Sequence, residues 1–245
     1  MGSPVLLLRL EGPLQSWGGR SRWDVRDTQP EPTKSGVIGL LGCAMGLERG
    51  DSRLEELDRG LRFGVRVEAP GRVLEDYQTV TDFLPTAARE YKHSGVKTSK
   101  SLQKLREDPT VEPSTIISPR YYLEDASFLV ALETQHHLGP SLAEIAEAVQ
   151  SPRWTLFLGR KSCVPTRPVF DAYTAQYEGL EDALHKHPWS WLGRDAVLRR
   201  IKPERLVAYL EQEDGPYRRQ DAFRVNPLRQ YGFVAMRRIS VQGVI

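Results

Sequence analysis

A loop near the start of the chain carries residue types suited to contacting nucleic acid. It contains glycines, an indole and closely spaced arginines. An indole can stack on a base, and neighbouring guanidinium groups can neutralise phosphates. The alternative is a solvated loop with Trp17 packed beneath it. The nucleic-acid interpretation predicts contacts from Gln15, Ser16, Trp17, Gly18, Arg20, Arg22 and Arg26.

A second candidate lies at Pro32–Gly39, where Thr33 or Ser35 can cap a helix. The first N–H groups of a helix are unpaired and lie at the positive end of its dipole, which favours a phosphate. Lys34 adds a full charge, so Lys34 and Ser35 are predicted to bind phosphate. A capped helix without a ligand remains the alternative. A nucleotide-binding P-loop is excluded, because that motif needs glycine where this chain has Thr28 and Thr33.

The third candidate is a basic segment between Arg89 and Arg106. It holds six cations and one acid, Glu90, so its local charge is 6 − 1 = +5 in a chain whose net charge is only +2. A basic segment of this kind suits a nucleic-acid backbone, and each phosphate contact makes binding more sensitive to salt. A solvated charged face is the alternative. The predicted contacts are Arg89, Lys92, Lys97, Lys100 and Lys104.

A fourth candidate is the segment Leu158–Cys163. A glycine followed by two cations at the end of a strand can hold a phosphate, which predicts contacts from Arg160, Lys161 and Ser162. The alternative is a strand terminator with two surface charges.

Residues for catalysis are sparse. The five histidines lack carboxylate or cysteine companions at a metal-ligand spacing, so no metal and no cofactor are expected. The one enzymatic hypothesis is metal-independent RNA cleavage by general acid–base chemistry at Tyr91, Lys92 and His93.

The elements that would position these residues follow a β-α-β-β-α-β order. Strands are predicted at Val5–Leu10, Phe63–Val67, Phe128–Glu133 and Trp154–Leu158, with helices from about Thr33 and from Pro140. This is the ferredoxin-like arrangement of RNA-recognition sheets, an α+β fold. An insertion from about Gln78 to Pro119 separates the second and third core strands.

A change in composition at Pro165–Pro168 predicts a boundary between two parts. Residues 1–165 would form the ferredoxin-like domain, and residues 166–245 a smaller β-rich part with strands at Leu206–Leu210 and Tyr231–Val241.

Composition narrows the class of protein. Hydrophobic residues make up 40% and charged residues 27%, as in ordinary globular proteins. Cys43 and Cys163 match no metal-ligand spacing and fit reduced thiols, and the longest apolar run, Val37–Leu47, is too short to span a bilayer. We therefore expect a cytoplasmic protein without a membrane partner or a small-molecule substrate.

Four segments resemble the CasD family of type I-E Cascade. They are Leu7–Gly18, with its Gln-x-Trp-Gly turn; Pro32–Gly46, with Pro-Thr-Lys-Ser-Gly opening a helix rich in glycine and leucine; Tyr121–Ala126; and Leu156–Cys163. The matches stay in register from residue 5 to about residue 165.

The resemblance implies a RAMP-type ferredoxin-like domain with a thumb, matched here by the insertion. It implies a non-catalytic subunit that caps the 5′ handle of the CRISPR RNA in antiviral defence and contacts the backbone subunit CasC and the large subunit CasA. Type I-C relatives of the family cut the repeat with Tyr, Lys and His. The alternative of a repeat endoribonuclease using Tyr91, Lys92 and His93 therefore stays open.

Overall fold

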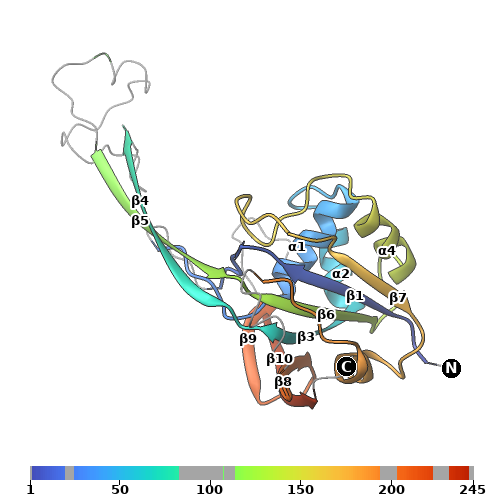
Figure 1. The fold of residues 1–245 in the computed structure, drawn as a ribbon. Helices are drawn as coiled ribbons and strands as arrows, with labels where there is room; N and C mark the ends of the chain where they lie inside the picture. The colour runs from blue at the N-terminus through green and yellow to red at the C-terminus, as the bar shows by residue number, and fades with distance from the viewer. Residues whose placement is uncertain are drawn as a thin grey trace. The chain divides into compact units, whose positions relative to one another are not determined.

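The computed structural model describes residues 2–19, 25–82, 107, 114–193, 203–222 and 232–242. It is a mixed α/β protein with antiparallel sheets (Figure 1). A seven-stranded sheet has the order β7-β1-β6-β3-β8-β10-β9, and a three-stranded sheet has the order β2-β5-β4. The elements are β1 Val5–Glu11, β2 Leu14–Gln15, α1 Lys34–Met45, α2 Arg53–Gly60, β3 Leu61–Ala69, β4 Arg72–Asp82, β5 Ser114–Glu124, β6 Ser127–Thr134, α4 Leu142–Gln150, β7 Phe170–Thr174, α5 Leu180–Lys186, β8 Arg205–Glu211, β9 Tyr217–Ala222 and β10 Gly232–Gln242.

The chain divides into two compact units. The larger comprises residues 1–20, 27–74 and 122–245, and the smaller comprises residues 21–26 and 75–121. The smaller unit corresponds closely in sequence to the predicted insertion. It contains most of β4 and β5, and Thr81 and Thr115 share a hydrogen bond of 2.7 Å between their hydroxyl oxygens.

Strand β1 runs through the centre of the larger unit. All seven of its residues are buried, which explains the nearly continuous apolar sequence. It pairs with β6 on one side and β7 on the other. Leu6, Leu8 and Leu10 face one core, while Val5 and Leu7 face a second core on the opposite side of the sheet.

Helices cover both sides of the sheet. Helices α1, α2 and α4 pack on the first core, and α5 packs on the second (Figure 1). The predicted capping of α1 is confirmed: the Thr33 hydroxyl accepts a hydrogen bond from the Gly36 amide at 3.1 Å. Gly46 ends the helix in the left-handed conformation at φ 69°, which favours glycine.

The predicted helix after Pro140 is confirmed as α4. Ser141 and Glu144 form a capping box, each side chain bonding the backbone of the other residue. The four apolar positions predicted to face the core are all buried: Leu142, Ile145, Ala146 and Val149.

The predicted strand at Trp154–Leu158 is wrong. Leu156 and Leu158 are buried as an apolar run should be, but the segment is irregular. The Leu158 amide donates to the Cys163 carbonyl within a turn instead of to a neighbouring strand. The place beside β1 belongs to β7.

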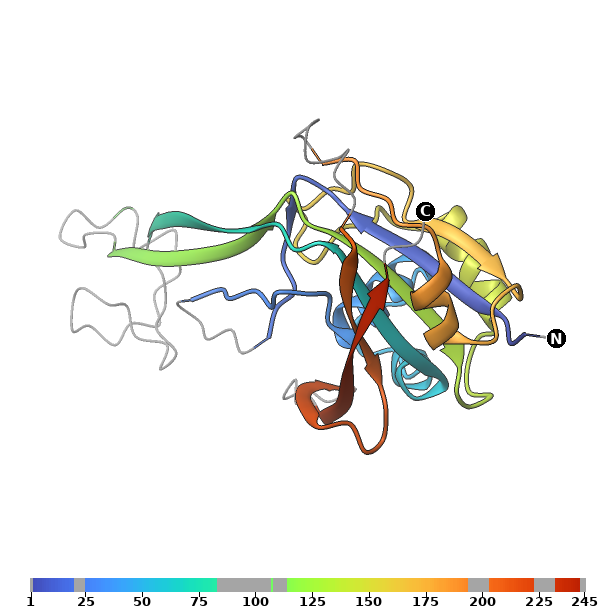
Figure 2. The same cartoon turned by 60° about the horizontal axis from the view of Figure 1, so that its bottom comes forward.

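The residues after Pro165 extend the main sheet. Strand β7 pairs with β1, β8 pairs with β3, and β10 and β9 continue outward (Figure 2). The two strands predicted for this region are confirmed, but they lengthen the first sheet and do not build a separate one.

Buried charges join neighbouring strands of the sheet and hold the end of α5 against it. Arg9 pairs with Asp171 at 2.9 Å, and Arg66 pairs with Glu68 at 2.7 Å. Arg66 also donates to the carbonyl oxygens of Leu184 and His187. Burial of paired, hydrogen-bonded charges makes this region sensitive to loss of any one partner.

Within the part of the chain that the structure describes, no helix is long and apolar enough to cross a membrane.

Candidate nucleic-acid interface

The turn after β1 is built from buried polar side chains. The Gln15 amide donates to the carbonyl oxygens of Leu10 and Ala126, and its oxygen accepts from the Trp17 indole at 3.0 Å. Gln15 is fully buried and Trp17 is 1% exposed. Neither side chain is open to RNA, so the structure does not support the predicted contacts at these two residues. Trp17 is instead part of the buried core of the larger unit, which agrees with the alternative of a packed indole.

The same turn joins two of the predicted segments. The Ser16 amide donates to the Leu158 carbonyl at 3.0 Å. Gly159 has φ 95°, and a Cβ there would overlap the Ser16 carbonyl oxygen, so this close approach requires glycine. Segments 15–18 and 158–163 therefore lie side by side, as a shared binding surface needs.

The Leu158–Cys163 segment presents its polar residues on a tight turn. The Cys163 amide donates to the Arg160 carbonyl at 2.9 Å. The Arg160 guanidinium lies 4.6 Å from the centre of the Tyr122 ring, a cation–π contact that orients it. Lys161 and Ser162 are exposed, as is Gly18 in the adjoining turn. Burial raises the pKa of the Cys163 thiol, which stays protonated at neutral pH.

The start of α1 is already occupied by an anion from the chain itself. One carboxylate oxygen of Asp221 accepts from the Lys34 amide at 2.6 Å, and the other accepts from the Ser35 amide at 2.9 Å and the Ser35 hydroxyl at 2.6 Å. Asp221 is on β9 and is 3% exposed. The helix end attracts negative charge as predicted, but a carboxylate takes the place expected for a phosphate.

The Lys34 side chain is also engaged internally. Its ammonium group is buried and pairs with Glu211 of β8 at 2.8 Å. The structure therefore does not support the predicted phosphate contact of Lys34 and Ser35, because the amides, the hydroxyl and the ammonium all have partners within the chain.

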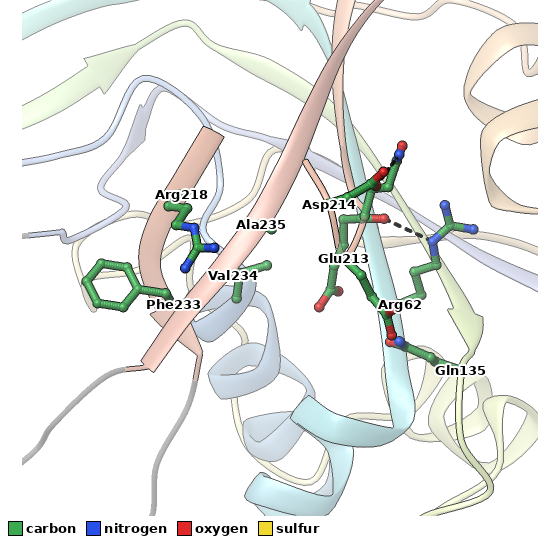
Figure 3. Close-up of a pocket in the computed structure, with 10 residues that line it drawn as sticks. Arg62, Gln135, Glu213, Asp214, Arg218, Phe233, Val234 and Ala235 are labelled. Atoms are coloured by element: carbon green, nitrogen blue, oxygen red, sulfur yellow. Dashed lines mark hydrogen bonds between the residues drawn. The ribbon is translucent and has the colours of Figure 1, made fainter. Parts of the chain in front are cut away.

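A hollow of about 590 Å³ lies near the turn between β8 and β9 (Figure 3). Arg218 and Phe233 border it on one side, and Arg62, Glu213 and Asp214 lie across from them. The Arg62 guanidinium pairs with Glu133 at 2.8 Å. Exposed carboxylates at Glu213 and Asp214 would repel phosphate, so the hollow does not suit an RNA backbone.

Among the histidines that the structure describes, His187 makes structural side-chain contacts. His187 lies between the Tyr177 hydroxyl, 2.9 Å from Nδ1, and the Asp171 carboxylate, 2.8 Å from Nε2. Among the residues that the structure describes, no group of three or more His, Cys, Asp or Glu side chains could hold a metal ion.

Comparison with known proteins gives a consistent result. The family model described as "CRISPR-associated protein (Cas_Cas5)" matches residues 5–237. The chain belongs to this family. It is 38% identical over 174 residues to the protein named "CRISPR system Cascade subunit CasD" from Escherichia coli (strain K12), and the match covers 67% of this chain and 69% of that protein.

Two solved structures are similar to this Cas5-family chain. One, described as "CRISPR RNA-guided surveillance complex", has a TM-score of 0.70 and 28% identity, and the match covers 97% of this chain and 90% of the other. The second, described as "Crystal structure of Cas protein", has a TM-score of 0.65 and 33% identity over 98% and 95% of the two chains.

The remaining predicted contacts of this Cas5-family chain are Arg26 and nine positions that lie outside the described residues. Arg26, in the smaller unit, is described: it is exposed, and its amide donates to the Pro119 carbonyl at 2.9 Å. The positions outside the described residues are Arg20, Arg22, Arg89, Tyr91, Lys92, His93, Lys97, Lys100 and Lys104.

A group of exposed residues on the C-terminal strands was not predicted from the sequence. Arg205, Tyr217 and Arg238 lie on β8, β9 and β10, and all three are exposed. Alternation along the strands predicted at Leu206–Leu210 and Tyr231–Val241 could have indicated that these strands carry cations on one face. Alternation within one strand does not show which neighbours complete that face.

Proposed function

We propose that this chain is a non-catalytic subunit of a type I-E Cascade complex that binds the 5′ handle of the CRISPR RNA in antiviral defence. The Escherichia coli relative is named as a Cascade subunit, and one similar solved chain is described as an RNA-guided surveillance complex. Both names support membership of such a complex. The proposed partners are the RNA, the backbone subunit CasC and the large subunit CasA, with the complex in the cytoplasm.

The strand order supports a ferredoxin-like RAMP classification. The strands β7, β1, β6 and β3 lie side by side in that order, all antiparallel, with α1 after β1 and α4 after β6. A β-α-β-β-α-β chain with its fourth strand beside the first has this arrangement. The smaller unit is then the thumb that the family resemblance implies.

One observation carries the RNA-binding proposal: the juxtaposition of the Ser16 turn and the Gly159 turn. It brings exposed Gly18, Lys161 and Ser162 near the oriented Arg160 guanidinium. Cations, a hydroxyl and exposed backbone on adjoining turns can hold phosphates and read polar edges of a single strand.

Exposed apolar side chains in the smaller unit support its use in contacts within the complex. Val25 is 43% exposed, Tyr77 is 63% exposed and Ile117 is 49% exposed. Aromatic and aliphatic residues of this kind are typical of the centres of interfaces.

The test combines binding and cleavage. The full chain is incubated with labelled CRISPR-repeat RNA in chelator, and a filter assay and a denaturing gel score bound and cut RNA. We expect binding without cutting. Replacing Arg160 and Lys161 with Ala should weaken binding about tenfold at low salt. The plot of log association constant against log salt concentration has a negative slope. Its magnitude should decrease by about 1.4, since each phosphate contact on a single strand contributes about 0.7.

Lys186→Ala provides the matched control, because it removes an exposed cation from α5. Equal weakening by the control would argue against a site at Arg160 and Lys161. Site-specific cleavage in chelator, abolished by His93→Ala, would replace the proposal with the endoribonuclease. If the native chain and all variants join the complex but none of them binds RNA, the subunit acts only as a protein scaffold.

A further inference from the structure

The side of strands β8, β10 and β9 that faces α1 has an uneven charge balance. Three described carboxylates on or against it each have a cationic or amide partner within the chain. Glu211 pairs with Lys34 at 2.8 Å, Glu31 lies 3.1 Å from Arg219, and Asp221 accepts from the first amides of α1. These acids contribute little free negative charge to the surface.

Two arginines on the same face have no such partner among the described residues. Arg238 is opposite Tyr209 and Gln242 is opposite Arg205 in the β10–β8 register, so Arg205, Tyr209 and Arg238 share one face. Arg205 and Arg238 are exposed, and neither forms an ion pair or side-chain hydrogen bond with another residue that the structure describes. The charge left over on this face is therefore positive.

Two tyrosines flank Arg238. Tyr209 lies directly across on β8. Tyr217 of β9 is opposite Met236, two residues from Arg238 on the same face, and is therefore a diagonal neighbour. Tyr217 is 51% exposed, and Tyr209 is half-buried against the core. Burial is the main cause that raises the pKa of Tyr209, and the nearby Glu31 carboxylate raises it further. The hydroxyl therefore stays protonated and can donate a hydrogen bond.

The other face of the same strands differs. Phe233 and Ala235 alternate with the buried Val234 and Met236, so they point away from α1, toward the hollow with its exposed carboxylates. Arg205, Tyr209, Tyr217 and Arg238 therefore lie on the face opposite to Phe233 and Ala235.

Ser240 is exposed and lies opposite Val207, on the same face as Arg238. We propose that Arg205, Tyr209, Tyr217, Arg238 and Ser240, here named the β8–β10 strip, bind a short single-stranded segment of RNA. The inference rests on the proposed function and adds a second contact surface to it. Guanidinium groups fit phosphates bidentately, a tyrosine ring stacks on a base without strong sequence preference, and hydroxyls bond to base edges or the ribose. Because the charge left over on this face is positive, the strip suits RNA better than a protein surface of mixed charge.

The experiment measures binding of fluorescently labelled, repeat-derived single-stranded RNA to the full chain by anisotropy over a salt series. Arg238→Ala should weaken binding about fivefold at low salt. It should also decrease the magnitude of the slope of log association constant against log salt concentration by about 0.7. Tyr217→Ala should weaken it about tenfold with an unchanged slope, because stacking carries no counterion release. Tyr217→Phe keeps the ring and should bind within about twofold of the native chain.

Arg218→Ala is the matched control, since Arg218 is an exposed arginine beside Tyr217 on the opposite face. If Arg218→Ala weakens binding as much as Arg238→Ala, the strip is not a specific surface and the inference is overturned. It is also overturned if Arg238→Ala and Tyr217→Ala bind RNA normally while Arg160 and Lys161 replacements do not, in which case the proposed function survives alone. Absence of RNA binding by the native chain would overturn both.

Discussion

Trp17 is the clearest case in which the type of a residue did not predict its role. An indole beside glycines and arginines is compatible with base stacking, yet this indole is 1% exposed and donates to Gln15. It also limits what can pack above it, because a Cβ at Gly36 would lie 3.0 Å from its ring. Trp17 stabilises the turn that carries Ser16 toward Gly159.

We predict that Trp17→Ala lowers the free energy of unfolding by about 3–5 kcal/mol, because it leaves a large cavity and an unpaired Gln15 oxygen. Thermal denaturation followed by circular dichroism provides the measurement. Trp154→Ala is the matched control: Trp154 is 42% exposed and should cost less than about 1 kcal/mol. A large loss of RNA binding by Trp17→Phe at unchanged thermal stability would instead favour stacking.

Among the helices and strands, the start of α1 shows how a helix can attract an anion without recruiting a ligand. Asp221 reaches from β9 to two amides and a hydroxyl of the helix. Because the carboxylate belongs to another strand, this contact joins α1 to the edge of the sheet as well as capping it.

Asp221→Asn should destabilise the fold by about 1–3 kcal/mol, because hydrogen bonds to a charged group and the favourable interaction with the helix dipole are both weakened. Chemical denaturation measures the change. Asp214→Asn, at an exposed position in the turn after β8, should be nearly neutral. If Asp221→Asn left stability unchanged and increased RNA affinity, the carboxylate would be masking a phosphate site.

For the molecule as a whole, the larger unit depends on segments from both ends of the sequence. The second core combines Val5, Leu7, Leu129 and Ala131 with residues that come after position 165. Those later residues are Tyr177, Leu180, Ala183, Leu184, Leu206, Ala208, Leu210 and Val241. The boundary predicted near Pro165 therefore runs through a shared core.

A fragment ending at residue 165 should fail to form a stable fold, because it exposes one entire face of β1 and β6 and removes both β7 and β8 from the sheet. Hydrogen exchange and far-ultraviolet circular dichroism of the fragment and of the full chain would check this. A fragment with native-like protection in β1 and β6 would show that residues 1–165 fold independently.

Local signals in the amino-acid sequence were enough to locate several elements and to indicate the family. The spacing of apolar residues, the helix-capping residues and the turn residues predicted the positions of β1, α1 and α4, since these signals act over a few neighbouring residues. The four quoted motifs indicated the family that the comparisons then showed. Lys161 and Ser162 are exposed, and the contact at Leu158–Cys163 stays a prediction.

Which charges remain available for a ligand depends instead on how distant segments meet in the fold. Lys34 and Asp221 are 187 residues apart in the sequence, and strand β9 lies between Tyr209 and Arg238 in the sequence, yet each pair meets. Such contacts depend on long-range strand pairing, which has no local signature. For the same reason a buried apolar run at Trp154–Leu158 resembled a strand, while Phe170–Thr174 took the place beside β1.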